Sequence, residues 1–109
     1  MRHRDTRIMY VECKAGGDHR GEARICRVRF SKTGRTIYVG EMALQRGNLI
    51  YGNYFNVETR VEYWVSGPKQ KGGDRHWAGG GPVFVDPDVA DEYWREIRKC
   101  DPPSDPSRA

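Results

Sequence analysis

Hydrophobic and polar residues alternate along most of the first 65 residues, with the period of two that is typical of β-strands. The alternation is clearest in RICRVRF at 24–30, where apolar side chains share one face and arginines share the other. Segments of this kind predict six short strands, at 9–13, 24–30, 36–40, 49–55, 61–65 and 82–85. The pattern therefore predicts a mainly β (α+β) fold, a small curled antiparallel sheet or half-open barrel with one C-terminal helix.

The first two strands are expected to form an antiparallel hairpin around the turn-rich segment AGGDHRGEA. The register that matches buried with buried residues makes three pairs: Met9 with Phe30, Val11 with Val28, and Cys13 with Cys26. It places Tyr10 and Glu12 on the outer face, opposite Arg29 and Arg27. The two thiols would then face each other in the core, either as packed small side chains or as a disulfide or redox pair.

A helix is predicted at 87–99, because Asp86 can cap it and Pro87 suits its first turn. Helical spacing places five apolar side chains on the face that should cover the sheet: Val89, Ala90, Tyr93, Trp94 and Ile97. The domain should span 7–99. The segment 1–6 should be a flexible basic N-terminus, and 100–109, with three prolines, a disordered tail.

The net charge of +4 is unevenly distributed, since residues 1–35 carry 10 Lys and Arg against 4 acids. Such a surplus attracts anionic partners, so nucleic acid is one possible partner and a protein is another. No apolar run is long enough to span a membrane, and the N-terminus lacks an apolar signal segment, which predicts a cytoplasmic protein without a membrane partner. The three cysteines have no metal-binding spacing, and no cofactor or metal is indicated.

The segment SGPKQKGGDRHWAGGGPVFVD at 66–86 is the strongest site signal, because residue types that bind ligands lie between glycines. Long loops of this composition are usually functional or disordered. The candidate ligand-binding residues combine this loop with the arginines of the second strand: Arg27, Arg29, Lys69, Lys71, Arg75, His76 and Trp77. No catalytic residue is assigned.

Two segments, RICRVRFSKTGRTIYVG (24–40) and NYFNVETRVEYWVSGPKQKGGDRHWAGGG (53–81), resemble a family of small, functionally uncharacterised bacterial proteins. Members are sometimes labelled 1-deoxy-D-xylulose-5-phosphate synthase. This label is not carried over, because the chain lacks the Gly-Asp-Gly motif that binding thiamine diphosphate needs. The resemblance covers about residues 7–98 and implies a cytoplasmic stand-alone domain. Glycine is usual in that family at the positions of Cys26 and Arg60, which predicts an altered turn at 58–60 and argues against a redox role for Cys26.

Three classes of function follow. The first is a non-enzymatic module that binds nucleic acid, with arginines and lysines on phosphates and Tyr10, Tyr38 or Trp77 stacked on bases. The second is a module that binds a protein through a sheet edge, the glycine-rich loop or Trp77. The third is a small enzyme in which His76 is the acid or base and Asp74 orients it. A binding module for an anionic partner is the preferred interpretation, with a protein-binding or regulatory module as the alternative.

Overall fold

The computed structural model describes residues 6–15, 22–68 and 82–109. Its strands are, in chain order: β1 Thr6–Cys13, β2 Ala23–Phe30, β3 Thr36–Val39, β4 Met42–Arg46, β5 Tyr54–Asn56, β6 Glu62–Ser66 and β7 Val83–Val85. A short helix follows, α1 at Ala90–Glu92, which continues as the π-helical segment η2 at Tyr93–Ile97. The predicted mainly β fold with one C-terminal helix is confirmed.

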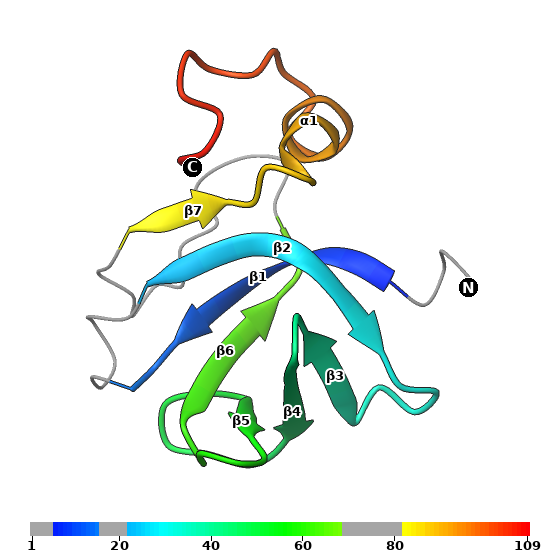
Figure 1. Ribbon diagram of the computed structural model, residues 1–109, viewed down its shortest axis with the longest axis vertical. Helices are drawn as coiled ribbons and strands as arrows, with labels where there is room; N and C mark the ends of the chain where they lie inside the picture. The colour runs from blue at the N-terminus through cyan, green and yellow to red at the C-terminus, as the bar shows by residue number, and fades with distance from the viewer. Residues whose placement is uncertain (1–5, 16–21, 69–81) are drawn as a thin grey trace.

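Six of these strands form a closed antiparallel barrel (Figure 1). Each of the strands β1 to β6 pairs with its neighbour in the sequence, and β1 closes the barrel by pairing with both β2 and β6. The seventh strand, β7, lies outside the barrel and pairs in parallel with the first half of β2. Because β2 pairs with β7 at one end and with β3 at the other, three of its residues between these pairings have no strand partner on that edge.

The β1–β2 pair separates two hydrophobic cores. Inside the barrel, Val11, Cys26 and Val28 pack with side chains of the other strands. On the opposite face, Tyr10 and Ile25 are fully buried under β7 and the helix. The prediction that Tyr10 and Glu12 lie on an outer face is therefore wrong, because both side chains are buried and β7 and the helix cover Tyr10.

The helix packs on the second core through the predicted face. Val89 and Tyr93 are fully buried, Trp94 is nearly so, and Ala90 and Ile97 pack beside them. The helix is shorter than the predicted 87–99, and Asp86 makes no side-chain cap. Its last turn is π-helical, with the Arg98 amide donating to the Tyr93 carbonyl at 2.9 Å.

The tail at 100–109, for which we expected disorder, lies along β7 in the structure. The Val85 amide donates to the Ser107 carbonyl at 2.7 Å, and the Ala109 amide donates to the Val83 carbonyl at 3.0 Å. The Trp94 indole donates to the Pro106 carbonyl at 2.9 Å. These hydrogen bonds cover the outer edge of β7, which would otherwise present unpaired backbone groups.

The predicted hairpin register is wrong by four residues. Met9 lies opposite Cys26, not Phe30, and Glu12 lies opposite Ala23, not Arg27. The shift is even, so Val11 still points into the barrel. It places Cys13 four residues along β1 from the partner of Cys26, about 13 Å at the usual rise per residue. This separation excludes the disulfide or redox pair.

The predicted strand at 49–55 is also wrong in most of its length. The chain forms β4 at Met42–Arg46, which the sequence reading missed, and then an ordered loop before the short β5. Asn53 attaches this loop to β6 through two hydrogen bonds. The Val65 amide donates to the Asn53 Oδ1, and the Asn53 Nδ2 donates to the Val65 carbonyl, both at 2.8 Å. Gly52 lies so close to the backbone of β6 that a Cβ atom would come within 2.3 Å of the Tyr63 carbonyl oxygen.

Two tight turns connect β2 to β3 and β5 to β6. Gly34 has a φ of 76°, as predicted for the turn at 31–35. The turn between β5 and β6 has Arg60 at a φ of 68°, in the left-handed region that favours glycine. The Asn56 side chain holds this turn by accepting hydrogen bonds from the amides of Glu58 and Thr59.

Across the described ranges, none of the helices has the length and apolar character that crossing a bilayer would require.

Candidate functional site

Only two of the seven predicted ligand-binding residues lie in the described part of the chain. Arg27 and Arg29 both lie on the outer face of β2, and both are exposed. Arg27 donates to the Glu92 carboxylate of the helix at 2.7 Å, whereas Arg29 lies over the ring of Tyr38, 4.1 Å from its centroid. The other five, Lys69, Lys71, Arg75, His76 and Trp77, lie outside the described residues, as does the Asp74 of the enzyme hypothesis.

Arg29 belongs to a cluster of exposed cations around the β2–β3 turn, which we call the basic end: Arg7, Arg29, Lys32, Arg35 and Arg46. Strand pairing brings these residues together from three parts of the chain. Arg7 lies opposite Val28, next to the Thr6–Arg29 pair, so Arg7 and Arg29 are close along the strands but lie on opposite faces of the β1–β2 pair. The Arg46 amide donates to the Arg35 carbonyl at 2.8 Å. Strand pairing thus brings four cations of the segment 1–35, together with Arg46, to the end of the barrel at the β2–β3 turn.

Three of these arginines lie over aromatic rings. The guanidinium of Arg29 is the nearest, on Tyr38, while Arg7 lies 5.6 Å from the Phe30 centroid and Arg46 lies 5.9 Å from that of Tyr54. Among the described residues, none of the five cations of the basic end forms an ion pair with a carboxylate. The basic end therefore presents positive charge that no acidic side chain of the described chain neutralises, and three of its guanidinium groups lie over aromatic rings.

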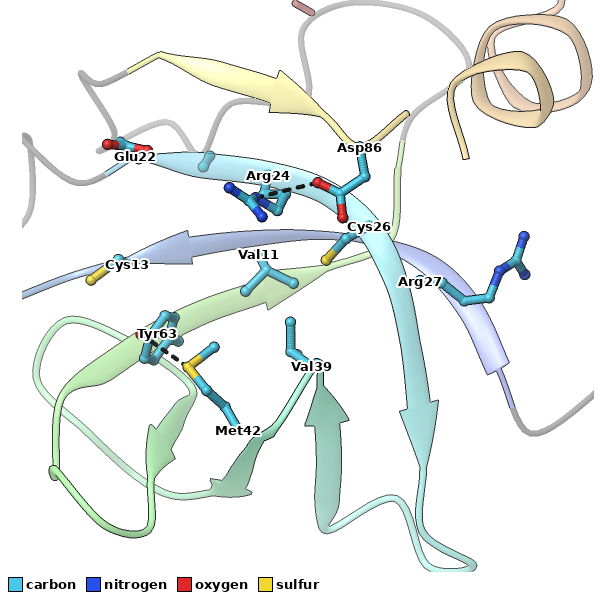
Figure 2. Close-up of a pocket in the computed structure, with 12 residues that line it drawn as sticks. Val11, Cys13, Glu22, Arg24, Cys26, Arg27, Val39, Met42, Tyr63 and Asp86 are labelled. Atoms are coloured by element: carbon cyan, nitrogen blue, oxygen red, sulfur yellow. Dashed lines mark hydrogen bonds and ion pairs between the residues drawn. The ribbon is translucent and has the colours of Figure 1, made fainter. Parts of the chain in front are cut away.

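A second feature is a pocket of about 320 Å³ in the side of the barrel, where β3 diverges from β2 (Figure 2). Five strands contribute to its wall, and its lining residues include Val11, Cys13, Arg24, Cys26, Val39, Met42, Tyr63 and Asp86. The floor is mostly apolar, with three sulfur-containing side chains. Arg27 also borders the pocket, but its side chain extends away from the others in Figure 2.

The sulfur-containing side chains of the pocket have different surroundings. Cys26 is buried, and this burial, with a smaller contribution from the nearby Asp86 carboxylate, raises the pKa of its thiol to about 12. Cys13 is half-buried beside Tyr63, whose pKa is raised by burial and by its interaction with Cys13. The Tyr63 hydroxyl donates to the Met42 Sδ at 3.4 Å. A protonated Cys26 makes the pocket floor neutral at physiological pH, so the floor suits an apolar group.

The rim of the pocket carries one ion pair of opposite charges. The Arg24 Nε lies 3.3 Å from the Asp86 Oδ1, and the two side chains are 56% and 26% exposed. Burial raises the pKa of Asp86, and the Arg24 guanidinium only partly offsets this effect. Arg24 reaches the rim because it lies opposite Val11 on the barrel side of β2, and Asp86 directly follows β7.

The expected stacking of Tyr10 on a base is excluded, because this side chain is fully buried. Its hydroxyl donates to Glu12 Oε1 at 2.6 Å, and the Lys14 ammonium donates to Glu12 Oε2 at 2.6 Å. The Glu12 and Lys14 side chains are 1% and 0% exposed. Because these residues alternate with Val11 and Cys13, the pattern that marked one face of β1 as buried gave no indication that the other is buried too.

One exposed apolar group is held in an ordered loop. Ile50, at 84% exposed, is the most exposed of the large hydrophobic residues described. The loop is fixed because the Glu62 carboxylate accepts hydrogen bonds from the amides of Tyr51 and Gly52 at 2.7 and 2.9 Å. No sequence signal pointed to this loop, since the segment was predicted as a strand.

Within the part of the chain that the structure describes, no three His, Cys, Asp or Glu side chains gather closely enough to hold a metal ion. The described residues thus offer two candidate sites, the basic end and the side pocket. No protein-family model, curated protein or solved structure matches this chain.

Proposed function

We propose that the protein is a non-enzymatic module that binds single-stranded nucleic acid through the basic end. The observation that supports this proposal best is the combination of five exposed cations without carboxylate partners in the described chain and three guanidinium groups over aromatic rings. Proteins that bind single strands without strong sequence preference combine a positively charged surface with π-surfaces on which bases stack.

The aromatic component favours nucleic acid over an acidic protein. The planar guanidinium of Arg29, which lies 4.1 Å from the centroid of the Tyr38 ring, offers a surface on which an unpaired base can stack. The neighbouring cations Lys32 and Arg35 lie on the β2–β3 turn, within reach of the phosphates that flank such a base. In this arrangement the phosphate contacts supply most of the affinity, and stacking favours a single strand over a duplex.

The test is fluorescence anisotropy of a labelled single-stranded RNA, with a duplex of the same sequence and with inorganic polyphosphate as competitor. We expect micromolar binding of the single strand at about 50 mM salt, weaker binding of the duplex, and incomplete competition by polyphosphate because it lacks bases. No binding of the single strand at low salt would contradict the proposal.

A matched pair of variants localises the binding. Arg29→Gln with Arg46→Gln removes two cations that lie over aromatic rings, and Arg27→Gln with Arg95→Gln removes two that pair with carboxylates at the helix. Both double variants lower the net charge by two. We expect the first to weaken RNA binding by roughly tenfold or more and the second to change it by less than about threefold. Equal losses would indicate that net charge alone drives binding.

A second candidate function, binding of a protein partner, is favoured by Ile50. An exposed isoleucine in a loop fixed by Glu62 and Asn53 presents an apolar contact with little ordering cost. The test is to cross-link the protein in cells, purify it and identify the captured partner. The Ile50→Ser variant serves as the control. A partner captured by the wild type and lost in Ile50→Ser would support this function; equal capture by both would contradict it.

A further inference from the structure

The side pocket places an apolar floor next to a pair of opposite charges. Val11, Val39 and Met42 line the floor together with the neutral thiol of Cys26. The Arg24–Asp86 pair lies at the rim, as Figure 2 shows. These residues lie apart from the five cations of the basic end, and the nucleic-acid proposal makes no use of them.

We propose that this pocket binds a free apolar α-amino acid as its zwitterion. The ligand carboxylate binds Arg24, the ligand ammonium binds Asp86, and the side chain enters the pocket. The single 3.3 Å contact between Arg24 and Asp86 is replaced by two contacts with the ligand, so neither charge loses its partner.

A zwitterion fits this rim better than a ligand with a single charge. A simple anion on Arg24 would separate the guanidinium from Asp86 and leave that carboxylate, only 26% exposed, without a counter-ion. A simple cation on Asp86 would likewise leave the Arg24 guanidinium without a counter-ion.

The size of the pocket and the chemistry of its floor limit the ligand to a single amino acid. A volume of about 320 Å³ lies at the lower end of the range for small-molecule sites, which excludes a dinucleotide-sized cofactor. Sulfur atoms from Cys13, Cys26 and Met42 make favourable contacts with aromatic rings. The Tyr63 hydroxyl donates to the weak thioether acceptor of Met42 and interacts with the Cys13 thiol. Phenylalanine and methionine therefore fit the floor better than a polar amino acid.

Calorimetric titration of the full-length protein with three matched compounds tests the assignment. L-phenylalanine carries both charges, 3-phenylpropionate lacks the ammonium group, and 2-phenylethylamine lacks the carboxylate. We expect L-phenylalanine to bind roughly tenfold or more tightly than either analogue, because each analogue leaves one rim charge unpaired. A smaller preference would overturn the zwitterion assignment, and no binding of L-phenylalanine at about 10 mM would overturn the site itself.

Two rim variants distinguish the roles of the charges. In Arg24→Gln the preference of L-phenylalanine over 2-phenylethylamine should disappear, and in Asp86→Asn its preference over 3-phenylpropionate should disappear. Unchanged preferences in both variants would overturn the proposal. Val39→Phe, which fills the floor, should abolish binding while its circular dichroism stays that of the wild type. RNA affinity should be unchanged in all three variants, so this test and that of the basic end fail or succeed separately.

Discussion

Arg27 and Arg29 lie two residues apart on one face of β2, yet their side chains contact different kinds of groups. Towards the helix, Arg27 pairs with Glu92, and Arg24 pairs with Asp86. At the basic end, Arg29 lies over Tyr38. We call the segment 82–109 with the face that it covers the helix end. The contrast shows that two arginines on the same face of a strand can have different partners, a carboxylate for Arg27 and an aromatic ring for Arg29.

The distribution of acids along the sequence produces this contrast. Five acids lie in or beside the helix: Asp86, Asp88, Asp91, Glu92 and Glu96. The segment 1–35 has the surplus of cations. Folding places the acids over one half of β2 and leaves the other half, with the β2–β3 turn, without such neighbours. At the helix end, charged side chains form ion pairs within the structure, whereas the cations of the basic end have no carboxylate partner among the described residues.

The largest difference between the ends should be in stability. Trp94→Ala removes a nearly buried side chain from the core under the helix, together with its hydrogen bond to the Pro106 carbonyl. We expect it to lower the free energy of unfolding by about 3–5 kcal/mol, measured by urea denaturation. Arg29→Gln with Arg46→Gln, at the basic end, should cost less than about 1 kcal/mol. Similar losses in both variants would remove the distinction between the ends.

The buried ion pair of Glu12 and Lys14 should give the next largest effect. Lys14→Met leaves the Glu12 carboxylate buried without its cation and should cost about 3 kcal/mol in urea denaturation. The double variant Glu12→Gln with Lys14→Met removes both charges and keeps an acceptor for the Tyr10 hydroxyl. It should be more stable than the single variant. A double variant as unstable as Lys14→Met would show that packing, not charge, sets the cost.

A smaller effect is the pH dependence of stability that Asp86 should give to the helix end. Because burial raises the pKa of Asp86, the folded protein holds this proton more tightly than the unfolded chain does. Asp86 therefore favours the folded state at pH values below its unfolded pKa, near 3.8, and this contribution is lost as the pH rises through the folded pKa. The stability of Asp86→Asn relative to wild type should rise with pH over this window and then level off. A difference independent of pH would contradict the burial of Asp86.

The sequence predicted the strands where one face is clearly apolar, and failed where both faces are buried. The alternation of RICRVRF gave β2 and the orientation of Arg27 and Arg29 correctly. It could not give the register with β1, because the intervening glycine-rich turn does not fix the pairing and both faces of β1 carry apolar residues. The strand β4 was missed, although Gly40 at the first position of a two-residue turn is a typical hairpin signal.

The basic end could be predicted in part, and the pocket could not. Four of its five cations lie in the segment 1–35, whose charge surplus was evident, and only Arg46 joins from β4. The pocket depends on where β3 diverges from β2, and it joins side chains from β1, β2, β6 and the end of β7. No local pattern contains that information, because the distance between these strands is set by the closure of the barrel.

The most direct test of the central claim, that the basic end is the nucleic-acid site, is the salt dependence of single-stranded RNA binding. Each phosphate contact adds about 0.7 to the slope of log affinity against log salt concentration for single strands. Arg29→Gln with Arg46→Gln should therefore lower the slope by about 1.4, which is twice that value, and Arg27→Gln with Arg95→Gln should leave it unchanged. The same slope in the first double variant as in the wild type would contradict the account.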